Sequence, residues 1–275
     1  MRHSFYIRRF LEHRFGHGRL HLKRLFRDDL VSFVGGYAKQ SMPGAAQAVA
    51  AALRKYLRYL QLQGICGDEL VAAVPTTPCW KLASLPRTMT EDQLRTLLSS
   101  FDRATAMGRR NYAMIMLMST LGLRASEVAL LQLDDVDWRE STLRIAIPKS
   151  RRRKTLPLPN ATGRAIADYL RRGRPATSHR HVFARHVARR DVPLTGNTVR
   201  EMTIRAYRRC GFDPKWNGTH ILRHTVATQL HQRGATLKEV ADLLGHRSID
   251  TSAVYAKVNL PALVAVALPW PEVTT

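Results

Sequence analysis

Several features are scarce in this chain of 275 residues, and each absence excludes a class of protein. There are only three cysteines, Cys66, Cys79 and Cys210, and none has C-x-x-C spacing. This argues against a disulfide framework or a cysteine zinc site and fits a reducing cytoplasm. The longest uncharged apolar runs, 111–123 and 258–270, are shorter than the ~18 residues expected of a membrane span.

Acidic side chains are also few. The chain has 44 Lys and Arg against 21 Asp and Glu, a net charge of +23 and a pI near 11, which does not suit an ordinary metabolic enzyme. The positive charge is not confined to a tail, because residues 1–87 hold 14 basic against 5 acidic side chains and residues 88–275 hold 30 against 16. Two basic parts predict a clamp on a polyanion. Charge alone leaves duplex DNA, ribosomal RNA and a membrane surface open.

A proline-punctuated stretch divides the chain. Pro75, Pro78 and Pro86 predict an extended linker rather than a helix. Thr90 and Gln93 then form a predicted capping box that opens a new helix. We therefore expect a helical DNA-binding domain over 1–85 and a second domain over 86–275. The chain shows no repeat of solenoid length, no low-complexity segment, and no apolar segment of the kind found in a secretory signal at its N-terminus.

The fold class predicted from apolar periodicity is mainly α with a small antiparallel β-sheet. In the first domain, the helical signals lie over 5–37 and over the basic amphipathic segment 45–63. In the second, helices are expected over 112–121, 161–170, 198–209, 218–233 and 237–244, and strands over 136–138, 142–147 and 155–158. Pro157 places the last strand at an edge. Gly122 is expected to end a helix, so that Arg124 begins the next one on a stiff element.

Five residues have side chains suited to holding and cleaving a phosphodiester: Arg124, His220, Arg223, His246 and Tyr255. Arginine donates two parallel hydrogen bonds to a phosphate and stays ionised, so it stabilises the charge that builds on the non-bridging oxygens. A tyrosine can act as nucleophile, but its pKa near 10 requires a group that takes its proton. Histidine and lysine can move protons to and from the reacting oxygens.

Each of these residues also has a simpler interpretation. His220 and His224 have the i, i+4 spacing of zinc ligands, but the segment lacks the glutamate of H-E-x-x-H and places Arg223 between them. Alone, His220 would be a capped or packed histidine, and Tyr255 an ordinary core or surface residue. Their combination with Arg124 favours the catalytic interpretation.

Together these segments resemble the tyrosine recombinases, the phage integrase and Xer-like family. The likeness covers roughly residues 90–257. Gly-Leu-Arg-Ala-Ser-Glu at 122–127 is similar to the family's first arginine box, His-Ile-Leu-Arg-His at 220–224 to its second, and Leu-Gly-His at 244–246 to the segment before its tyrosine. The motifs are specific in combination. The catalytic set that the resemblance implies is Arg124, Lys149, His220, Arg223, His246 and Tyr255.

The resemblance also implies roles. Arg124, buttressed by Glu127, and Arg223 would clamp the phosphate, and His246 would hydrogen-bond it. His220 would assist proton removal from the tyrosine, whereas His224, the last residue of its box, would be structural.

The family's lysine, which protonates the leaving oxygen, lies on the hairpin after the first arginine box. The hairpin at 147–154 offers two candidates: Lys149 is preferred by its distance from Arg124, and Lys154 is kept in reserve.

The reaction implied is attack of Tyr255 on DNA to give a 3′-phosphotyrosyl link and a free 5′ hydroxyl, without a metal or other cofactor. The implied partners are double-stranded DNA with a specific recombination site, a homotetramer that passes through a Holliday junction, and an accessory DNA-bending protein or partner recombinase, with no membrane. The expected location is the cytoplasm, at the nucleoid. The tail from about 260 would dock on a neighbouring protomer or pack on its own domain.

The sequence departs from the family pattern in one respect. Its first domain is short beside the usual four or five helices, as in a shortened member encoded by a mobile element. A DNA-binding regulator of the same fold and a topoisomerase-like enzyme stay as rival functions. Integration, excision, transposition and chromosome-dimer resolution are not distinguished.

Overall fold

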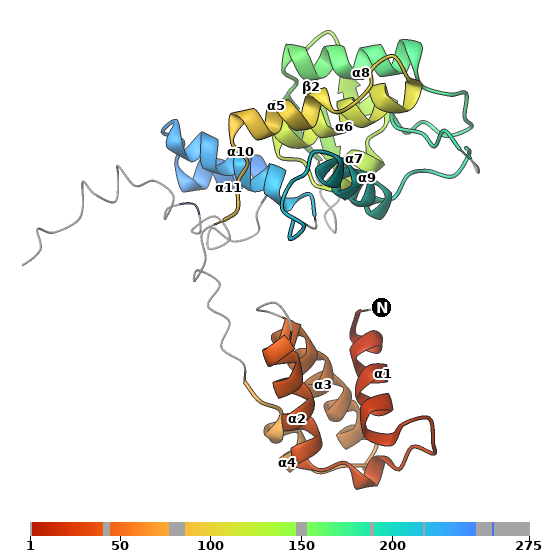
Figure 1. Ribbon diagram of the computed structural model, residues 1–275, viewed down its shortest axis with the longest axis vertical. Helices are drawn as coiled ribbons and strands as arrows, with labels where there is room; N and C mark the ends of the chain where they lie inside the picture. The colour runs from red at the N-terminus through yellow and green to blue at the C-terminus, as the bar shows by residue number, and fades with distance from the viewer. Residues whose placement is uncertain are drawn as a thin grey trace, which may run out of the picture. The chain divides into compact units, whose positions relative to one another are not determined.

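The computed structural model describes residues 2–40, 45–76, 86–146, 153–187, 190–216, 218–245 and 255. These residues fall into two compact units, Met1–Ala83 and Ser84–Thr275 (Figure 1). The division lies in the proline-punctuated stretch, of which residues 77–85 are outside the described residues. Each unit has an apolar core of its own. Among the described residues, no helix has the length and apolarity needed to cross a bilayer.

The first unit is helical throughout its described part. Its elements are α1 (Arg2–Phe15), the 3₁₀ helix η1 (Leu22–Arg24), α2 (Arg27–Gln40), α3 (Ala45–Leu62) and α4 (Asp68–Ala73). The predicted amphipathic segment 45–63 is confirmed as α3, which packs on α1 and α2 through a buried stripe that includes Val49, Leu53 and Leu57.

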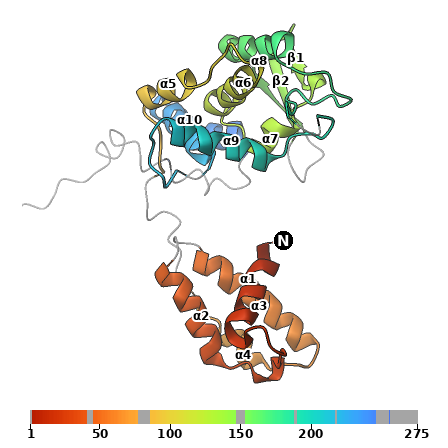
Figure 2. The ribbon, with the colours of Figure 1, turned by 45° about the vertical axis from the view of Figure 1, so that its right-hand side comes forward.

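The second unit combines helices with one small sheet (Figure 2). Its helices are α5 (Glu91–Ser99), α6 (Ala106–Leu121), α7 (Ala125–Leu130), η2 (Leu133–Asp135), α8 (Asn160–Arg172), α9 (Gly196–Arg209), α10 (His220–Gln232) and α11 (Leu237–Leu244). The strands β1 (Val136–Asp137), β2 (Thr142–Ala146) and β3 (Arg153–Pro157) pair antiparallel in the order β1-β2-β3. The predicted fold class and the edge position of the last strand are confirmed.

Helix α6 is the centre of this unit. It is buried over most of its length and packs against α5, α8 and α10. It begins at Thr105, whose hydroxyl accepts a hydrogen bond from the N–H of Gly108, so the predicted start at residue 112 was too late. It ends where predicted, at Gly122 with φ +62. A Cβ there would lie 2.6 Å from Leu244 Cδ2, so the glycine serves both the left-handed turn and the close approach of α11.

Two features fix α10, which carries the second histidine-arginine box, and α11, which follows it. The hydroxyl of Thr225 on α10 accepts a hydrogen bond of 2.8 Å from the N–H of Met89, which ties α10 to the start of the unit. The predicted capping box of Thr236 and Glu239 opens α11, and Gly245 with φ +63 closes it. The C-terminal ends of α6 and α11 meet beside α10, because Arg223 of α10 donates hydrogen bonds to the carbonyls of Gly122 and Leu244.

Candidate active site

Three cations from distant parts of the chain contact the C-terminal carbonyls of α11. Lys154 Nζ donates to the carbonyl of Leu243, Arg223 Nη2 to that of Leu244, and Arg124 Nη2 to that of Gly245 at 3.4 Å. The last carbonyls of a helix have no partner within the helix and carry partial negative charge. The end of α11 therefore gathers these cations into one cluster, which we call the cation cluster.

Arg124 reaches the cluster from the N-terminus of α7. The Glu127 carboxylate accepts a hydrogen bond from the backbone N–H of Arg124 at 2.8 Å and another from its Nη1 at 2.6 Å. The Glu127 side chain is only 7% exposed, whereas that of Arg124 is 34% exposed. The carboxylate thus fixes the guanidinium from the protein side and leaves the group open to a ligand.

Arg223 is the buried member of the cluster. It is 5% exposed, and its Nη1 donates to the carbonyl of Gly122 at 2.7 Å. Burial and the nearby charge of Arg124 lower the pKa of Arg223 to about 10, so the group stays protonated at neutral pH. No carboxylate pairs with Arg223 in the described part of the chain. A buried guanidinium held only by neutral carbonyls favours an anionic ligand.

Lys154 lies on β3, the edge strand. Burial lowers the pKa of Lys154 to about 8; Glu127 opposes the shift, and Arg223 and Arg124 add to it. A lysine with such a pKa exchanges protons near neutral pH. Lys149, which was predicted from the sequence to be the catalytic lysine, lies outside the described residues.

The nucleophile predicted from the sequence lies against α10. The Tyr255 hydroxyl is 2.8 Å from His224 Nδ1, and Tyr255 is 1% exposed. Burial raises the pKa of Tyr255, and the charge of Arg223 opposes the shift. His220 is exposed at the start of α10, and desolvation together with Arg223 and Arg124 lowers its pKa. His246 lies outside the described residues.

Sequence reasoning missed two parts of this arrangement. It assigned His224 a structural role and did not anticipate its contact with Tyr255. It did not anticipate the carbonyls of Leu243 and Leu244, because main-chain acceptors leave no mark in a sequence beyond the position of a helix end. The glycine at 245 was the one available signal, since it predicts where α11 stops.

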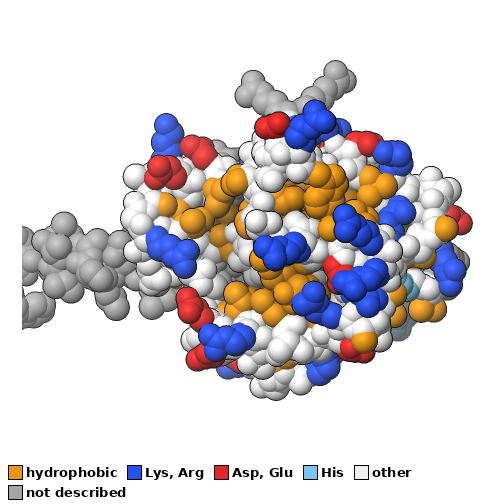
Figure 3. Space-filling model, turned by 90° about the horizontal axis from the view of Figure 1, so that it is seen from above, with side chains coloured by type: hydrophobic (Ala, Val, Ile, Leu, Met, Phe, Trp, Pro, Cys, Tyr) orange, Lys and Arg blue, Asp and Glu red, His pale blue; other side chains and the backbone are white. Residues whose placement is uncertain are grey.

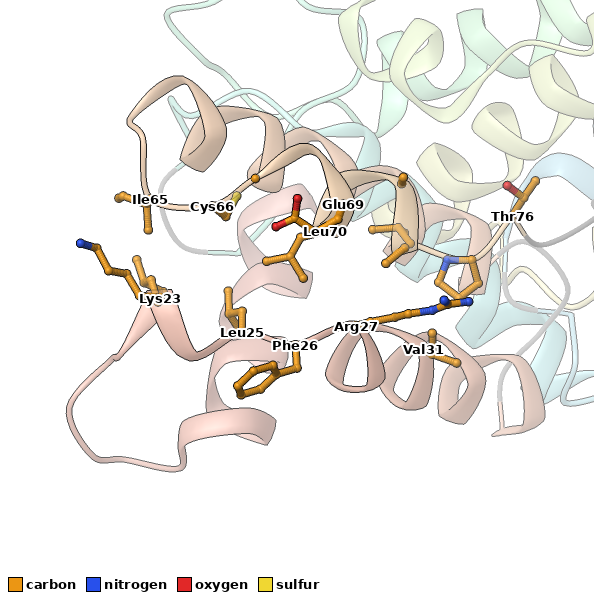
Figure 4. Close-up of a pocket in the computed structure, with 16 residues that line it drawn as sticks. Lys23, Leu25, Phe26, Arg27, Val31, Ile65, Cys66, Glu69, Leu70 and Thr76 are labelled. Carbon is orange, nitrogen blue, oxygen red and sulfur yellow. The ribbon is translucent and has the colours of Figure 1, made fainter.

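A pocket of about 1010 Å³ in the first unit is lined mostly by apolar side chains between η1, α2 and α4, and contains none of the predicted site residues (Figure 4). Within the described ranges, no group of three or more His, Cys, Asp or Glu is placed to hold a metal ion. Lys and Arg side chains are spread over the face in Figure 3, around exposed apolar surface.

Comparison with known proteins points to one family. The model of the phage integrase family matches residues 87–260. The putative integrase/recombinase y4rA of Sinorhizobium fredii is 42% identical over 269 residues, which is 96% of this chain and 64% of y4rA. The putative integrase/recombinase y4gC of the same strain is 38% identical over 190 residues, 68% of this chain and 97% of y4gC. The chain thus spans less than two thirds of y4rA and almost all of y4gC.

Solved structures share the fold. XerH site-specific recombinase bound to palindromic difH substrate, in a post-cleavage complex, superposes with a TM-score of 0.74 at 20% identity, over 96% of this chain and 76% of that one. A lambda integrase tetramer bound to a Holliday junction superposes with a TM-score of 0.63 at 20% identity, over 89% and 71%. These likenesses extend over both units, so the first unit also follows a known arrangement.

Proposed function

Since the chain belongs to the phage integrase family, we propose that it is a site-specific DNA recombinase that cleaves and rejoins DNA through a covalent 3′-phosphotyrosyl intermediate. The observation that carries the proposal is the cation cluster with Tyr255 beside it. Within the described part of the chain, a single carboxylate, that of Glu127, pairs with Arg124, Arg223 and Lys154, and a phosphodiester supplies the missing negative charge.

The first step is strand cleavage. Arg124 and Arg223 hold the non-bridging oxygens, and the Tyr255 oxygen attacks phosphorus. The bond from phosphorus to the 5′ oxygen breaks, and in this proposal that oxygen takes its proton from Lys154, whose Nζ belongs to the cation cluster. The proposal keeps His246 as a hydrogen-bond donor to the phosphate, and it gives His220 the tyrosine's proton after the rearrangement around Tyr255 that binding of DNA requires.

The second step is rejoining. The phosphotyrosyl bond keeps the energy of the broken phosphodiester, so the 5′ hydroxyl of a partner strand reverses the attack without another source of energy. Because Tyr255 is 1% exposed, the phosphate reaches its oxygen only after the groups that cover the ring move. Binding of DNA is therefore coupled to a rearrangement around this residue.

The partner that fits this chemistry is double-stranded DNA with a specific recombination site, acted on by a homotetramer. The high positive charge of both units and the likeness to a lambda integrase tetramer on a Holliday junction support this assembly. An accessory DNA-bending protein or a partner recombinase joins this tetramer on DNA where the recombination site must be distinguished from other sites. The reaction takes place on DNA in the cytoplasm.

A covalent trap tests the proposal. The native protein and its Tyr255→Phe variant are mixed with nicked fragments of source DNA, denatured and assayed for protein that stays attached. We expect an adduct at Tyr255 with the native protein only, and sequencing of the trapped DNA then gives the site. Ordinary adduct formation by the variant would place the nucleophile elsewhere. Tight, salt-sensitive binding without any adduct would instead favour a DNA-binding regulator, and site-independent relaxation of supercoiled plasmid a topoisomerase.

A further inference from the structure

The Tyr255 hydroxyl has one polar partner among the described residues. His224 Nδ1 lies 2.8 Å from the oxygen, and the two rings are 5.7 Å apart at 55°. The phenol ring packs in an apolar cluster with Ala227, Val240 and Leu244, which are 0%, 0% and 2% exposed. A hydroxyl buried in such surroundings depends on its partner for orientation, because water does not replace it.

His220 does not occupy this position. Its ring lies 6.3 Å from that of His224, and the residue is exposed at the first turn of α10. His224 lies one turn further along the same helix, directly after Arg223. Arg223, which holds the phosphate in the proposed function, and His224, the partner of Tyr255, therefore occupy adjacent positions on α10.

Both members of the pair are uncharged near neutral pH. Burial lowers the pKa of His224 to about 4, and His220 and Arg223 add to the shift, so the imidazole is neutral near pH 7. Burial raises the pKa of Tyr255, so the phenol keeps its proton. With the imidazole proton on Nε2, Nδ1 accepts from the hydroxyl; with the proton on Nδ1, it donates to the hydroxyl oxygen, so Nδ1 is the contacting atom in either tautomer.

We propose that His224 is a positioning residue of the proposed recombination reaction, and that its Nδ1 holds the Tyr255 hydroxyl beside Arg223 for attack. This role rests on the proposed function and adds His224, which was assigned a structural role from the sequence, to the residues that act in it. The contact keeps the oxygen against α10, next to Arg223. Loss of the contact leaves the nucleophile present but misplaced.

The side chains of asparagine and glutamine provide a matched test. Asparagine Oδ1 can take the place of the imidazole Nδ1, whereas glutamine places its amide nearer the Nε2 position. The single-turnover rate of adduct formation is measured at saturating nicked DNA that carries the trapped site. For His224→Ala and His224→Gln we expect a rate about 10²-fold lower, the loss that a misplacement of ~1 Å can cause. His224→Asn should recover most of the native rate, and DNA affinity should stay unchanged in all three variants.

A readout without catalysis separates this proposal from the proposed function. With 3-fluorotyrosine at position 255, the ¹⁹F resonance of the DNA-free protein reports the surroundings of the hydroxyl, including its contact with His224. His224→Ala should shift that resonance, and His220→Ala should leave it nearly in place. If the native protein forms no adduct at all, the proposed function fails while the fluorine signal still tests the contact.

Several results would overturn the positioning role. If His224→Ala reacts at the native rate, the reaction does not need the contact. If it reacts faster, the contact inhibits the reaction. Equal rates for the asparagine and glutamine variants would show that Nδ1 is not the atom that matters. Should the alanine variant fail to fold, the comparison of asparagine with glutamine decides alone.

Discussion

Raising the pH from 7 to 9 should slow strand cleavage by the free enzyme about tenfold. Lys154 gives a proton to the leaving 5′ oxygen in the proposed reaction, so only its protonated form is active. Its pKa of about 8 means that it is mostly protonated at pH 7 and mostly neutral at pH 9. The active fraction thus falls from about nine tenths to about one tenth as the pH rises through the pKa. Ionisation of Tyr255 does not offset this loss, because burial raises its pKa.

The assay is the second-order rate of adduct formation at limiting DNA, since that rate reports the pKa values of the free enzyme. A substrate with a 5′-bridging phosphorothiolate is the control, because its leaving group needs no proton. On that substrate the decline between pH 7 and 9 should vanish, and Lys154→Ala should be rescued while Lys149→Ala should not. A rate that stays level or rises with pH on the ordinary substrate would refute the assignment. Rescue of Lys149→Ala alone would return the role to Lys149.

Two further predictions concern the arginines of the cation cluster and the glycine that ends α6. Arg124→Ala and Arg223→Ala should each lower the rate of adduct formation about 10²- to 10³-fold at saturating DNA, the usual loss on removing one donor to a developing oxyanion; unchanged rates would contradict the phosphate clamp. Gly122→Ala should destabilise the second unit by at least about 1–2 kcal/mol, because alanine resists the left-handed conformation and its Cβ would meet Leu244. Gly211→Ala is the matched control, since Gly211 has φ +69 but nothing within 4 Å of its Cβ position. Equal urea midpoints for the two variants would rule out a contribution from the Leu244 contact.

The sequence predicted the parts of the fold that rest on local signals. The capping residues Thr90 and Thr236 and the glycine at 122 act within one helical turn, and the structure places helix ends at each. Helix α4 was not predicted, because six residues are too few to show a period. The early start of α6 was also missed, because Gly108, Arg109 and Arg110 interrupt the apolar pattern after Ala106 and Met107.

The cation cluster was only partly predictable, for a physical reason. Each arginine stands in a recognisable segment, but Lys154 lies among neighbouring cations that spacing does not separate. What distinguishes it is tertiary: the pairing of β3 with β2 and the approach of its Nζ to the carbonyl of Leu243. The partner of Tyr255 was hidden in the same way, since His220 and His224 share one helix and only the fold decides which one the phenol meets.

The use of main-chain carbonyls to hold the cations has a consequence for binding. A carboxylate beside each cation would fix its position but cancel its charge, and a phosphate would then have to displace an anion. The neutral carbonyls of Leu243, Leu244 and Gly245 orient Lys154, Arg223 and Arg124 while leaving their charges in place. Glu127 is the exception, and its ion pair is with Arg124, the arginine more exposed to solvent. The end of α11 thus pre-organises positive charge for an incoming phosphodiester, which is the condition for electrostatic stabilisation of the transition state.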